Sequence, residues 1–392
     1  MLDQNTVEII KATIPAVQPR ADEITACFYP LMFAQYPEVI PYFNQTHQAK
    51  GAQPKALANA VVAYAANIDS LGNLSDAVTR IVQKHCALGI LPEQYAIVGS
   101  CLLQAIKQVL GDAASDEVID AWGKAYQQLA DILIEAEEAV YAASARQPGG
   151  WRGEREFRVV RKQAESAVIS SFYLEPADGG AIPEFSPGQY ITVLTEIAGE
   201  PVRRNYSLSD APGTGYLRIS VKKEPEGVVS SFLHDQINEG DSLSLRAPFG
   251  EFTLRENSKP LVLLTGGVGI TPAMSMLNAA ASSGREIHFI HAALNSQAHA
   301  FKADVDQLAQ QHSNVQPFYI YNQPTDDCQP HARGLIDAQM ISALLPQTSD
   351  IEFYLLGPKP FMQAALKIAR SLGVPECQTH FEFFGPMEAL EA

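Results

Sequence analysis

The sequence predicts a multidomain protein in which an all-α region is followed by an antiparallel β-barrel and then by an α/β domain. Three observations support this fold class: a length of 392 residues, a break in composition near residue 148 and a change of pattern near residue 260. A chain of this length can bury two or three separate cores. We expect domains at residues 1–146, 152–257 and 260–392.

The first domain is predicted to be almost purely helical, because its glycines are few and its apolar residues recur at helical spacing. Pro54 and Pro92 suit the first turns of two helices, where the missing N–H of proline is not needed. Ser115–Glu117 is expected to start a last long helix, because its acidic groups stabilise a helix N-terminus. The segment Gln147–Trp151 contains proline and two glycines and is a predicted linker.

Two further patterns follow the linker. Between Arg152 and about Glu256, short β-rich runs such as FRVV, QYITVLTE and YLRISVKKE are separated by glycine and proline turns, which is typical of a small antiparallel barrel. From Pro260 onward, strand-like runs such as LVLLT and EIHFIHAA alternate with helix-like runs such as FMQAALKIARSLG. This alternation predicts a parallel sheet in a Rossmann-like α/β domain.

The composition argues against several classes of function. A formal net charge of −16 disfavours nucleic acid and anionic membrane surfaces as partners, because both need clustered Lys and Arg. No stretch reaches the roughly 18–20 apolar residues of a membrane span, and the N-terminus lacks a signal-peptide pattern. We therefore expect a cytoplasmic protein without stable membrane insertion. Five scattered cysteines without a CxxC motif indicate neither a disulfide framework nor a zinc or iron–sulfur site, and without CxxCH any haem is bound non-covalently.

The most informative residue of the helical region is His85. Val78, Ile81, Val82 and His85 share one stripe of a predicted helix over residues 75–90. A titratable ring on an apolar face needs a partner. Iron is one candidate partner, and a hydrogen bond inside a core, ordinarily the commoner case, is the other.

A glycine turn stands at the start of the α/β domain. The strand-like run Leu261–Thr265 is followed directly by Gly266–Gly269 and then by a helix-like run. Glycines let backbone N–H groups approach a pyrophosphate, whose charge a helix N-terminus stabilises. The third glycine of the GxGxxG pattern is absent here. A plain tight turn between strand and helix is therefore an equal alternative for this motif alone.

Three other motifs accompany the turn. Arg204–Ser207 (RNYS) offers a cation for a phosphate, an aromatic face for a ring and a hydroxyl. Gly227–Ser230 (GVVS) precedes an apolar helix start, and Glu382–Gly385 (EFFG) places aromatic side chains beside an acid. Each alone could be a barrel strand, a turn or a core aromatic pair. In this order they resemble the ferredoxin–NADP⁺ reductase family over about residues 150–392, with one departure at Leu356, where the family usually has Cys.

This resemblance implies FAD and a nicotinamide dinucleotide as cofactors. The residues that it assigns to the flavin side are Tyr190, Arg204, Asn205, Tyr206, Ser207, Gly227, Ser230, Phe383, Phe384, Gly385 and Pro386. Those that it assigns to the dinucleotide are Gly267, Val268, Gly269, Ile270, Thr271 and Pro272. The loop Leu294–Gln297 has no Arg or Lys to receive a 2′-phosphate, which favours NADH and leaves NADPH as the alternative.

The helical half resembles the globin domain of flavohaemoglobins. The strings FYPLMF, PYFN, QKH, LPEQY and DAWGKAY carry this resemblance, and the linker GGW extends it over the entire chain. It implies a globin fold that holds haem b. The family's functional positions correspond to Tyr29, Phe43, Gln53, Leu57, Lys84, His85, Tyr95, Glu135 and Glu382.

The resemblance implies a role for each of these positions on the proximal side. His85 is the axial haem ligand, its other ring nitrogen donates to Glu135, and Tyr95 joins the same network. Periodicity alone makes Tyr95 a core phenol and Glu135 a solvated surface residue. Lys84 and Glu382 are implied to tune the haem and flavin potentials.

On the distal side, Tyr29 and Gln53 are implied to hydrogen-bond dioxygen, while Leu57 limits the space and Phe43 wedges the macrocycle. From pattern alone, Tyr29 could equally be a packing aromatic. Gln53 could equally be a solvated residue at a helix start.

The function implied by the resemblance is that of a nitric oxide dioxygenase, which oxidises NO with O₂ to nitrate and takes electrons from NAD(P)H through FAD and haem b. The expected partners are these small molecules alone, and we expect a monomer. A haem-based gas sensor or an oxygen-binding protein with reductase activity is the alternative. The reductase of a ring-hydroxylating oxygenase shares the C-terminal half but normally adds a [2Fe–2S] domain with four closely spaced Cys, a pattern absent from this sequence.

Overall fold

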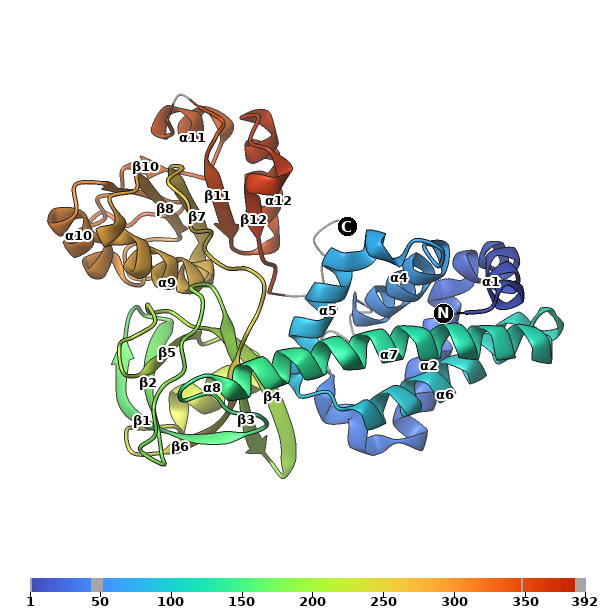
Figure 1. Ribbon diagram of the computed structural model, residues 1–392. Coiled ribbons are helices and arrows are strands. Elements are labelled where there is room, and N and C mark those ends of the chain that lie inside the picture. Colours follow the sequence, from blue (N-terminus) through green and yellow to red (C-terminus); the bar gives the residue numbers. More distant parts are fainter. Residues whose placement is uncertain (1, 44–51, 347, 385–392) are drawn as a thin grey trace. The chain divides into compact units, whose positions relative to one another are not determined.

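The computed structural model describes residues 2–43, 52–346 and 348–384. The chain separates into two compact units between residues 144 and 145. The first unit is helical and the second contains both β-sheets (Figure 1). The predicted fold class, an all-α region followed by an antiparallel sheet and a parallel sheet, is therefore confirmed.

The helical unit is built from long helices joined by short 3₁₀ turns. The helices are α1 Gln4–Val17, α2 Ala21–Gln35, α4 Ala52–Ala66, α5 Ser75–Leu88, α6 Pro92–Leu110 and α7 Asp116–Arg146. The 3₁₀ turns are η1 Gln18–Arg20, η2 Pro37–Tyr42, η3 Leu71–Leu74 and η4 Gly111–Ala113. α6 begins at Pro92 and α7 begins within Ser115–Glu117, as predicted, whereas α4 begins at Ala52 rather than at Pro54.

One core joins these helices. Ile10 of α1, Met32 of α2 and Ile106 of α6 are essentially inaccessible to solvent, and Trp122 of α7 packs among them. The indole N–H of Trp122 donates to the Thr13 hydroxyl at 3.0 Å, so the buried polar atom is satisfied. Burying a side chain of this size stabilises a fold by about 1.5–3 kcal/mol. The shared core therefore holds the helices that carry the candidate haem residues.

Within the part of the chain that the structure describes, no single helix is long and apolar enough to cross a membrane. One pair of consecutive segments is long and apolar enough when taken together, namely Leu71–Leu88 and Pro92–Ala113. The two segments are bent by 116° relative to each other.

The first sheet of the second unit is antiparallel. Its strands are β1 Arg155–Ala164, β2 Ile169–Pro176, β3 Tyr190–Ile197, β4 Glu200–Ser207, β5 Leu217–Lys222 and β6 Ser242–Phe249, and α8 Val228–Asp235 lies between the last two. The strand order is β4-β3-β6-β1-β2-β5. An antiparallel bridge between Leu208, just after β4, and Ile219 of β5 joins the two outer strands. The sheet thus curls into the predicted small barrel.

The second sheet is parallel. It consists of β7 Leu261–Gly266, β8 Ile287–Ala293, β9 Val315–Tyr321, β10 Ala332–Arg333, β11 Glu352–Leu356 and β12 Thr379–Phe381. The intervening helices are α9 Ile270–Ala280, α10 Lys302–Gln311, α11 Ala338–Leu344 and α12 Lys359–Ser371. The order β10-β9-β8-β7-β11-β12 reverses direction between β7 and β11. Ligands of such sheets bind beside the carboxyl ends of the strands at this reversal.

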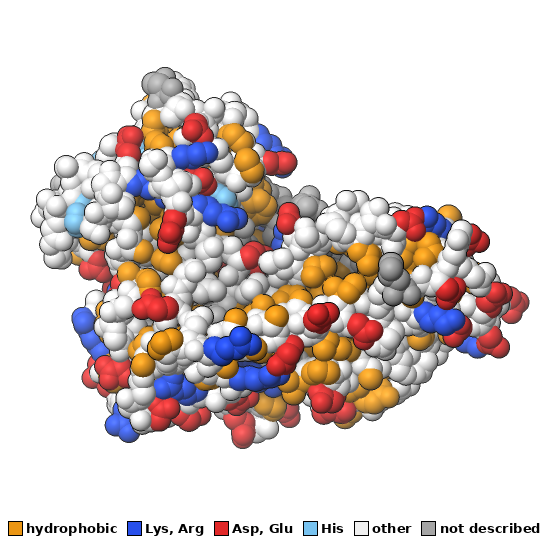
Figure 2. Space-filling view, viewed as in Figure 1, with side chains coloured by type: hydrophobic (Ala, Val, Ile, Leu, Met, Phe, Trp, Pro, Cys, Tyr) orange, Lys and Arg blue, Asp and Glu red, His pale blue; other side chains and the backbone are white. Residues whose placement is uncertain are grey.

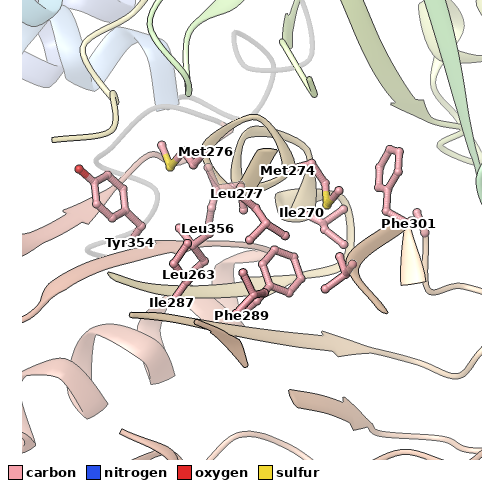
Figure 3. Close-up of a cluster of buried hydrophobic side chains, with 14 of the residues drawn as sticks. Leu263, Ile270, Met274, Met276, Leu277, Ile287, Phe289, Phe301, Tyr354 and Leu356 are labelled. Carbon is pink, nitrogen blue, oxygen red and sulfur yellow. The ribbon is translucent and has the colours of Figure 1, made fainter. Parts of the chain in front are cut away.

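The core of the second unit extends over both domains. Figure 3 shows Leu263 of β7 and Phe289 of β8 beneath Met274 of α9. The same buried cluster contains Ile169 and Phe252, which belong to the barrel part of the chain. The barrel and the parallel sheet therefore pack through a common apolar interior.

Charged side chains are distributed over the surface. On the face shown in Figure 2, Asp and Glu side chains lie scattered among Lys and Arg over both units. This distribution agrees with the composition of the sequence, which has 44 acidic and 28 basic residues.

Candidate functional site

His85 lies in the last turn of α5, which ends shortly after it. Gly89 has a φ of 77°, a backbone conformation that favours glycine, and its N–H donates to the His85 carbonyl at 2.8 Å. Val82 and Cys86 are buried on the same helix. The His85 side chain itself is 30% exposed. The helix end therefore presents a partly open imidazole at the margin of an apolar core.

Two side chains share the Nδ1 atom of His85. Glu137 Oε1 lies 2.7 Å from Nδ1, and the Tyr95 hydroxyl lies 2.9 Å from it. The same hydroxyl donates to Glu137 Oε1 at 2.5 Å. Burial raises the pKa of Tyr95 far above its ordinary value, and the bond to Glu137 raises it further. Tyr95 therefore stays protonated and acts as a donor to the buried carboxylate.

This network fixes the form of the His85 ring. A carboxylate accepts hydrogen bonds, so the proton of the neutral ring resides on Nδ1 and the lone pair on Nε2. Among the residues that the structure describes, Nε2 has no hydrogen-bond partner. A deprotonated ring nitrogen whose other nitrogen donates to a carboxylate is the usual form of a metal-bound histidine. The residues present therefore fit an axial ligand of haem iron.

The prediction that Glu135 is the acidic partner of His85 is wrong. Glu137 is 3% exposed and occupies that position, whereas Glu135 is exposed on α7. Two residues correspond to a rotation of about 200° around a helix, which places these two acids on nearly opposite faces. The missed signal was that Glu137 continues the apolar stripe of Leu133 and Tyr141 at spacings of four.

Tyr141 supports the same region one turn further along α7. Its hydroxyl donates to the Ile90 carbonyl at 2.9 Å, just beyond the end of α5. This bond ties α7, which carries Glu137, to the segment that follows His85.

Aromatic rings gather around Tyr29. Tyr29 is 6% exposed on α2 and lies edge-on to Phe28 and Phe43, with ring centroids 4.8 and 5.7 Å apart respectively. Phe43 is in turn edge-on to Phe33 at 5.3 Å. The structure therefore brings together Tyr29 and Phe43, two of the residues predicted for the distal side and the macrocycle.

A small apolar cavity lies in the same helical core, between α2, α4 and α6. It measures about 20 Å³, and Leu57 of α4, Ile24 of α2 and Leu102 of α6 are among the residues that line it. A cavity of this size has room for about one water-sized molecule. Leu57 thus borders space in the core, and its role in limiting a ligand pocket stays a prediction. The side chain of Gln53 lies outside the described residues.

The two residues predicted to tune redox potentials belong to different units. Lys84 is exposed beside His85 on α5, and Glu382 is partly buried directly after β12. Their tuning roles remain predictions.

The RNYS motif forms the end of β4, opposite β3, where Ser207 pairs with Tyr190. Arg204 donates to the Arg203 carbonyl at 2.7 Å and pairs with no carboxylate in the described residues. Burial lowers the pKa of Arg204, while the neighbouring Tyr206 opposes this shift. A partly buried guanidinium without an acidic partner is suited to a phosphate.

Ser207 provides a more direct test of the flavin prediction. It is 6% exposed, and its hydroxyl oxygen has no hydrogen-bond partner within the described chain. A buried polar atom without a partner costs about 1–3 kcal/mol. A ring with polar edge atoms, such as a flavin, would satisfy this hydroxyl. Asn205 is engaged differently, because its side-chain oxygen accepts a bond from the Thr192 hydroxyl at 2.9 Å within the barrel.

The GVVS motif forms a tight turn before α8. A Cβ on Gly227 would lie 2.3 Å from the Ser230 hydroxyl, so a larger residue would displace that side chain. The Ser230 hydroxyl donates to the Gly227 carbonyl and accepts from the Glu224 N–H, both at 3.1 Å. Ser230 therefore shapes the turn, and its contact with a cofactor phosphate stays a prediction.

The predicted dinucleotide turn lies at the reversal of the parallel sheet. Gly267–Gly269 follows β7, and a Cβ on Gly269 would lie 2.2 Å from the carbonyl oxygen of Leu356 at the end of β11. The Thr271 hydroxyl donates to the Val268 carbonyl at 3.1 Å and stabilises the turn. The side chains of Ile270 and Pro272 are buried in α9. Only the backbone atoms of these two residues could therefore contact a dinucleotide.

The C-terminal motif is described as far as residue 384. Phe383 is half-buried, and Phe384 is 48% exposed. Gly385 and Pro386, which were predicted to line the flavin site, lie outside the described residues.

Comparison with protein families gives one match for each part of the chain. Residues 26–133 match the globin family, residues 156–254 match the oxidoreductase FAD-binding domain, and residues 263–367 match the oxidoreductase NAD-binding domain.

Individual relatives match the chain from end to end. A flavohemoprotein of Burkholderia sp. (strain TH2) is 53% identical, with 100% of both chains covered. A flavohemoglobin structure from Malassezia yamatoensis with bound FAD and heme is 26% identical, covers 98% of this chain and 100% of that one, and has a TM-score of 0.86. The FAD/NAD-binding domain of a Vibrio cholerae nitric oxide dioxygenase is 36% identical, covers 59% of this chain and 99% of that one, and has a TM-score of 0.55. With its helical, FAD-type and NAD-type parts all matched in order, this chain belongs to the flavohemoprotein family.

Proposed function

We propose that this chain is an NAD(P)H-dependent nitric oxide dioxygenase that converts NO and O₂ to nitrate. The observation that carries the proposal is the pairing, in one chain, of a carboxylate-held His85 with flavin and dinucleotide motifs in the order of a reductase. A gas sensor or oxygen carrier has no use for such a reductase. The Vibrio cholerae relative, named for this activity, supports the same choice.

The cofactors proposed are haem b in the helical unit and FAD in the barrel. The globin match and the Malassezia relative with bound FAD and heme support both. Bound FAD would convert a two-electron hydride into single electrons, and bound haem would supply the iron centre at which O₂ and NO react. His85 would hold the haem, while Arg204, Tyr206 and Ser207 would hold the flavin.

Glu137 and Tyr95 act on the haem through His85. Glu137 accepts a hydrogen bond from the Nδ1–H group, which makes the imidazole a stronger electron donor and keeps the ring from rotating. Tyr95 shares this carboxylate and limits its freedom. We propose that this pair favours the oxidised side of the haem couple, because a more basic axial ligand stabilises the higher charge on the metal.

Tyr29 acts on the opposite, apolar side. It is the phenol within the aromatic cluster, and a phenol hydroxyl can donate a hydrogen bond to a small ligand. Leu57 would limit the cavity that it lines, and Phe43 would pack its ring against Tyr29. By the family resemblance, Gln53 would be a second hydrogen-bond donor to dioxygen.

The dinucleotide is proposed to bind across the turn Gly267–Gly269 and the end of β11. Gly269 allows the two strand ends to approach closely, and the N-terminus of α9 offers N–H groups to a pyrophosphate. We propose NADH as the preferred donor, because the loop Leu294–Gln297 carries no cation for a 2′-phosphate.

The state of the molecule in the cell is part of the same proposal. We propose a cytoplasmic monomer that does not insert into membranes, with domain limits at residues 146, 152, 257 and 260. Sedimentation velocity of the full chain tests the monomer, and limited proteolysis tests the limits between domains.

The decisive experiment measures NO consumption with and without O₂, with nitrate quantified as product. We expect NADH- and O₂-dependent loss of NO with stoichiometric nitrate, from a protein whose spectrum has both a haem Soret band and flavin absorption. A spectrum with flavin alone, or NO loss without nitrate, contradicts the proposal. Slow NO loss together with stable O₂ binding would indicate a carrier instead.

A further inference from the structure

One acidic side chain, Asp210, connects the barrel to the α/β domain. It lies three positions after Ser207, so the strand that carries the RNYS motif leads directly to it. Its side chain is 13% exposed. The two domains that it connects belong to the same compact unit.

Two side chains of α9 bind Asp210. The Ser275 hydroxyl donates to the Asp210 backbone carbonyl at 2.6 Å, and the Asn278 side-chain amide donates to Asp210 Oδ1 at 2.7 Å. Ser275 is fully buried. Since α9 begins directly after Gly267–Gly269, these bonds hold the helix that carries the dinucleotide turn.

The barrel holds the same carboxylate from the other side. The Tyr216 hydroxyl donates to Asp210 Oδ2 at 3.0 Å, and Arg218 Nη1 lies 3.3 Å from that oxygen. Arg218 is 6% exposed, so the ion pair is largely removed from water, where charges interact more strongly. Asp210 is thus bound to the barrel at β5 as well as to α9.

Arg218 also reaches the α/β domain directly. Its guanidinium lies 5.1 Å from the centre of the Phe301 ring, within the range of a cation–π contact. Phe301 immediately precedes α10 and has a φ of 60°, which bulky side chains rarely adopt. Such backbone persists only where the surroundings require it. Ala167 N–H, which donates to the Gln297 carbonyl at 2.9 Å, adds a third link between the domains.

We propose that Asp210 is a positioning residue for hydride transfer, which holds the glycine turn at a set distance from the flavin motif of β4. This inference rests on the function proposed above. In that reaction a hydride leaves the reduced nicotinamide with both electrons of its C–H bond, and the flavin accepts it. The donor and acceptor atoms must approach to about 3–3.5 Å, so a small displacement of α9 slows the step.

The test changes the α9 side of the link, because variants of Asp210 itself leave the buried Arg218 without its partner. Asn278→Asp places a carboxylate opposite Asp210 without changing side-chain size. Ser275→Ala removes the bond to the Asp210 carbonyl. Ser283→Ala is the matched control, because its hydroxyl also donates to a backbone carbonyl at 2.6 Å, but to Ala280 within its own domain.

The measurement is the rate of flavin reduction by NADH in the full-length holoenzyme, followed by anaerobic stopped-flow over a range of NADH concentrations. We expect Asn278→Asp to lower the limiting rate about ten-fold and Ser275→Ala to lower it less, because displacements of about 1 Å cost up to 10²-fold. The NADH dissociation constant should stay near the wild-type value, as should flavin content and the circular dichroism spectrum. With NADH deuterated at the transferred position, the isotope effect should persist in the limiting rate.

Two results would overturn this inference. One is a wild-type limiting rate in both α9 variants. The other is a loss of NADH affinity with an unchanged limiting rate, which would assign Asp210 to binding alone. Failure of the proposed function is distinguishable, because the wild-type protein would then not reduce its flavin with NADH at all.

Discussion

The two candidate sites of this protein are organised by different forces. The His85 site is held by side-chain hydrogen bonds among three helices, in which Glu137 stands 52 positions from the histidine that it orients. The dinucleotide turn is held by backbone sterics, because Gly269 leaves no room for a side chain against Leu356. Isosteric substitutions in a hydrogen-bond network weaken its function gradually. A close steric contact, by contrast, is disrupted as soon as one atom is added. The two sites should therefore respond differently to substitution.

The largest expected effect tests whether the two sites are separable. His85→Ala should abolish haem binding, because it removes the only ligand proposed on that side, and should leave NADH-to-dye reductase activity largely intact. Haem absorbance and dye reduction measure the two outcomes. Loss of both activities in a folded protein would show that the units do not function independently.

The next effect tests the steric contact. Gly269→Ala should slow NADH-dependent flavin reduction on the order of 100-fold, because its Cβ would lie 2.2 Å from a backbone oxygen that cannot move freely. Haem content should not change. Gly72→Ala is the control, since a Cβ there meets nothing within 4 Å. Equal rates in the two variants would contradict the proposed place of the turn.

A graded effect is expected in the hydrogen-bonded network. Glu137→Gln keeps the size of the side chain but removes its charge, so we expect NO turnover to fall about ten-fold, as for other partners of metal-bound histidines. The haem reduction potential should rise, because the imidazole donates less electron density. Redox titration and NO consumption measure both. Glu135→Gln is the matched control, and an equal loss in that variant would contradict the assignment of Glu137.

The smallest effect is expected on the distal side. Tyr29→Phe removes one hydrogen-bond donor and should speed O₂ release by roughly 2- to 10-fold, the equivalent of a bond worth about 0.5–1.5 kcal/mol. NO consumption should slow accordingly at low O₂. Flash photolysis or stopped-flow gives the O₂ off-rate, and an unchanged value would refute this role for Tyr29.

Contiguous motifs were the part of the site that could be predicted. The glycine turn, RNYS and GVVS are each read from a few neighbouring residues, and the backbone geometry of each is local. Glu137 was missed because its partner is distant in the sequence, although its spacing of four from the apolar Leu133 and Tyr141 distinguishes it from Glu135. The role of Asp210 was missed for a similar reason, since its partners Ser275 and Asn278 lie 65 and 68 positions away.

The sequence alone determined the order of the three folds, the family resemblance, His85 as the ligand candidate and the glycine turn, because periodicity, turn chemistry and short motifs are local properties of a chain. Only the tertiary structure decided that Glu137 holds His85, that the buried Ser207 hydroxyl has no partner among the described residues and that Asp210 joins barrel to helix. These depend on which distant side chains meet in a packed interior. There, an angstrom of displacement separates a hydrogen bond from an unsatisfied polar atom.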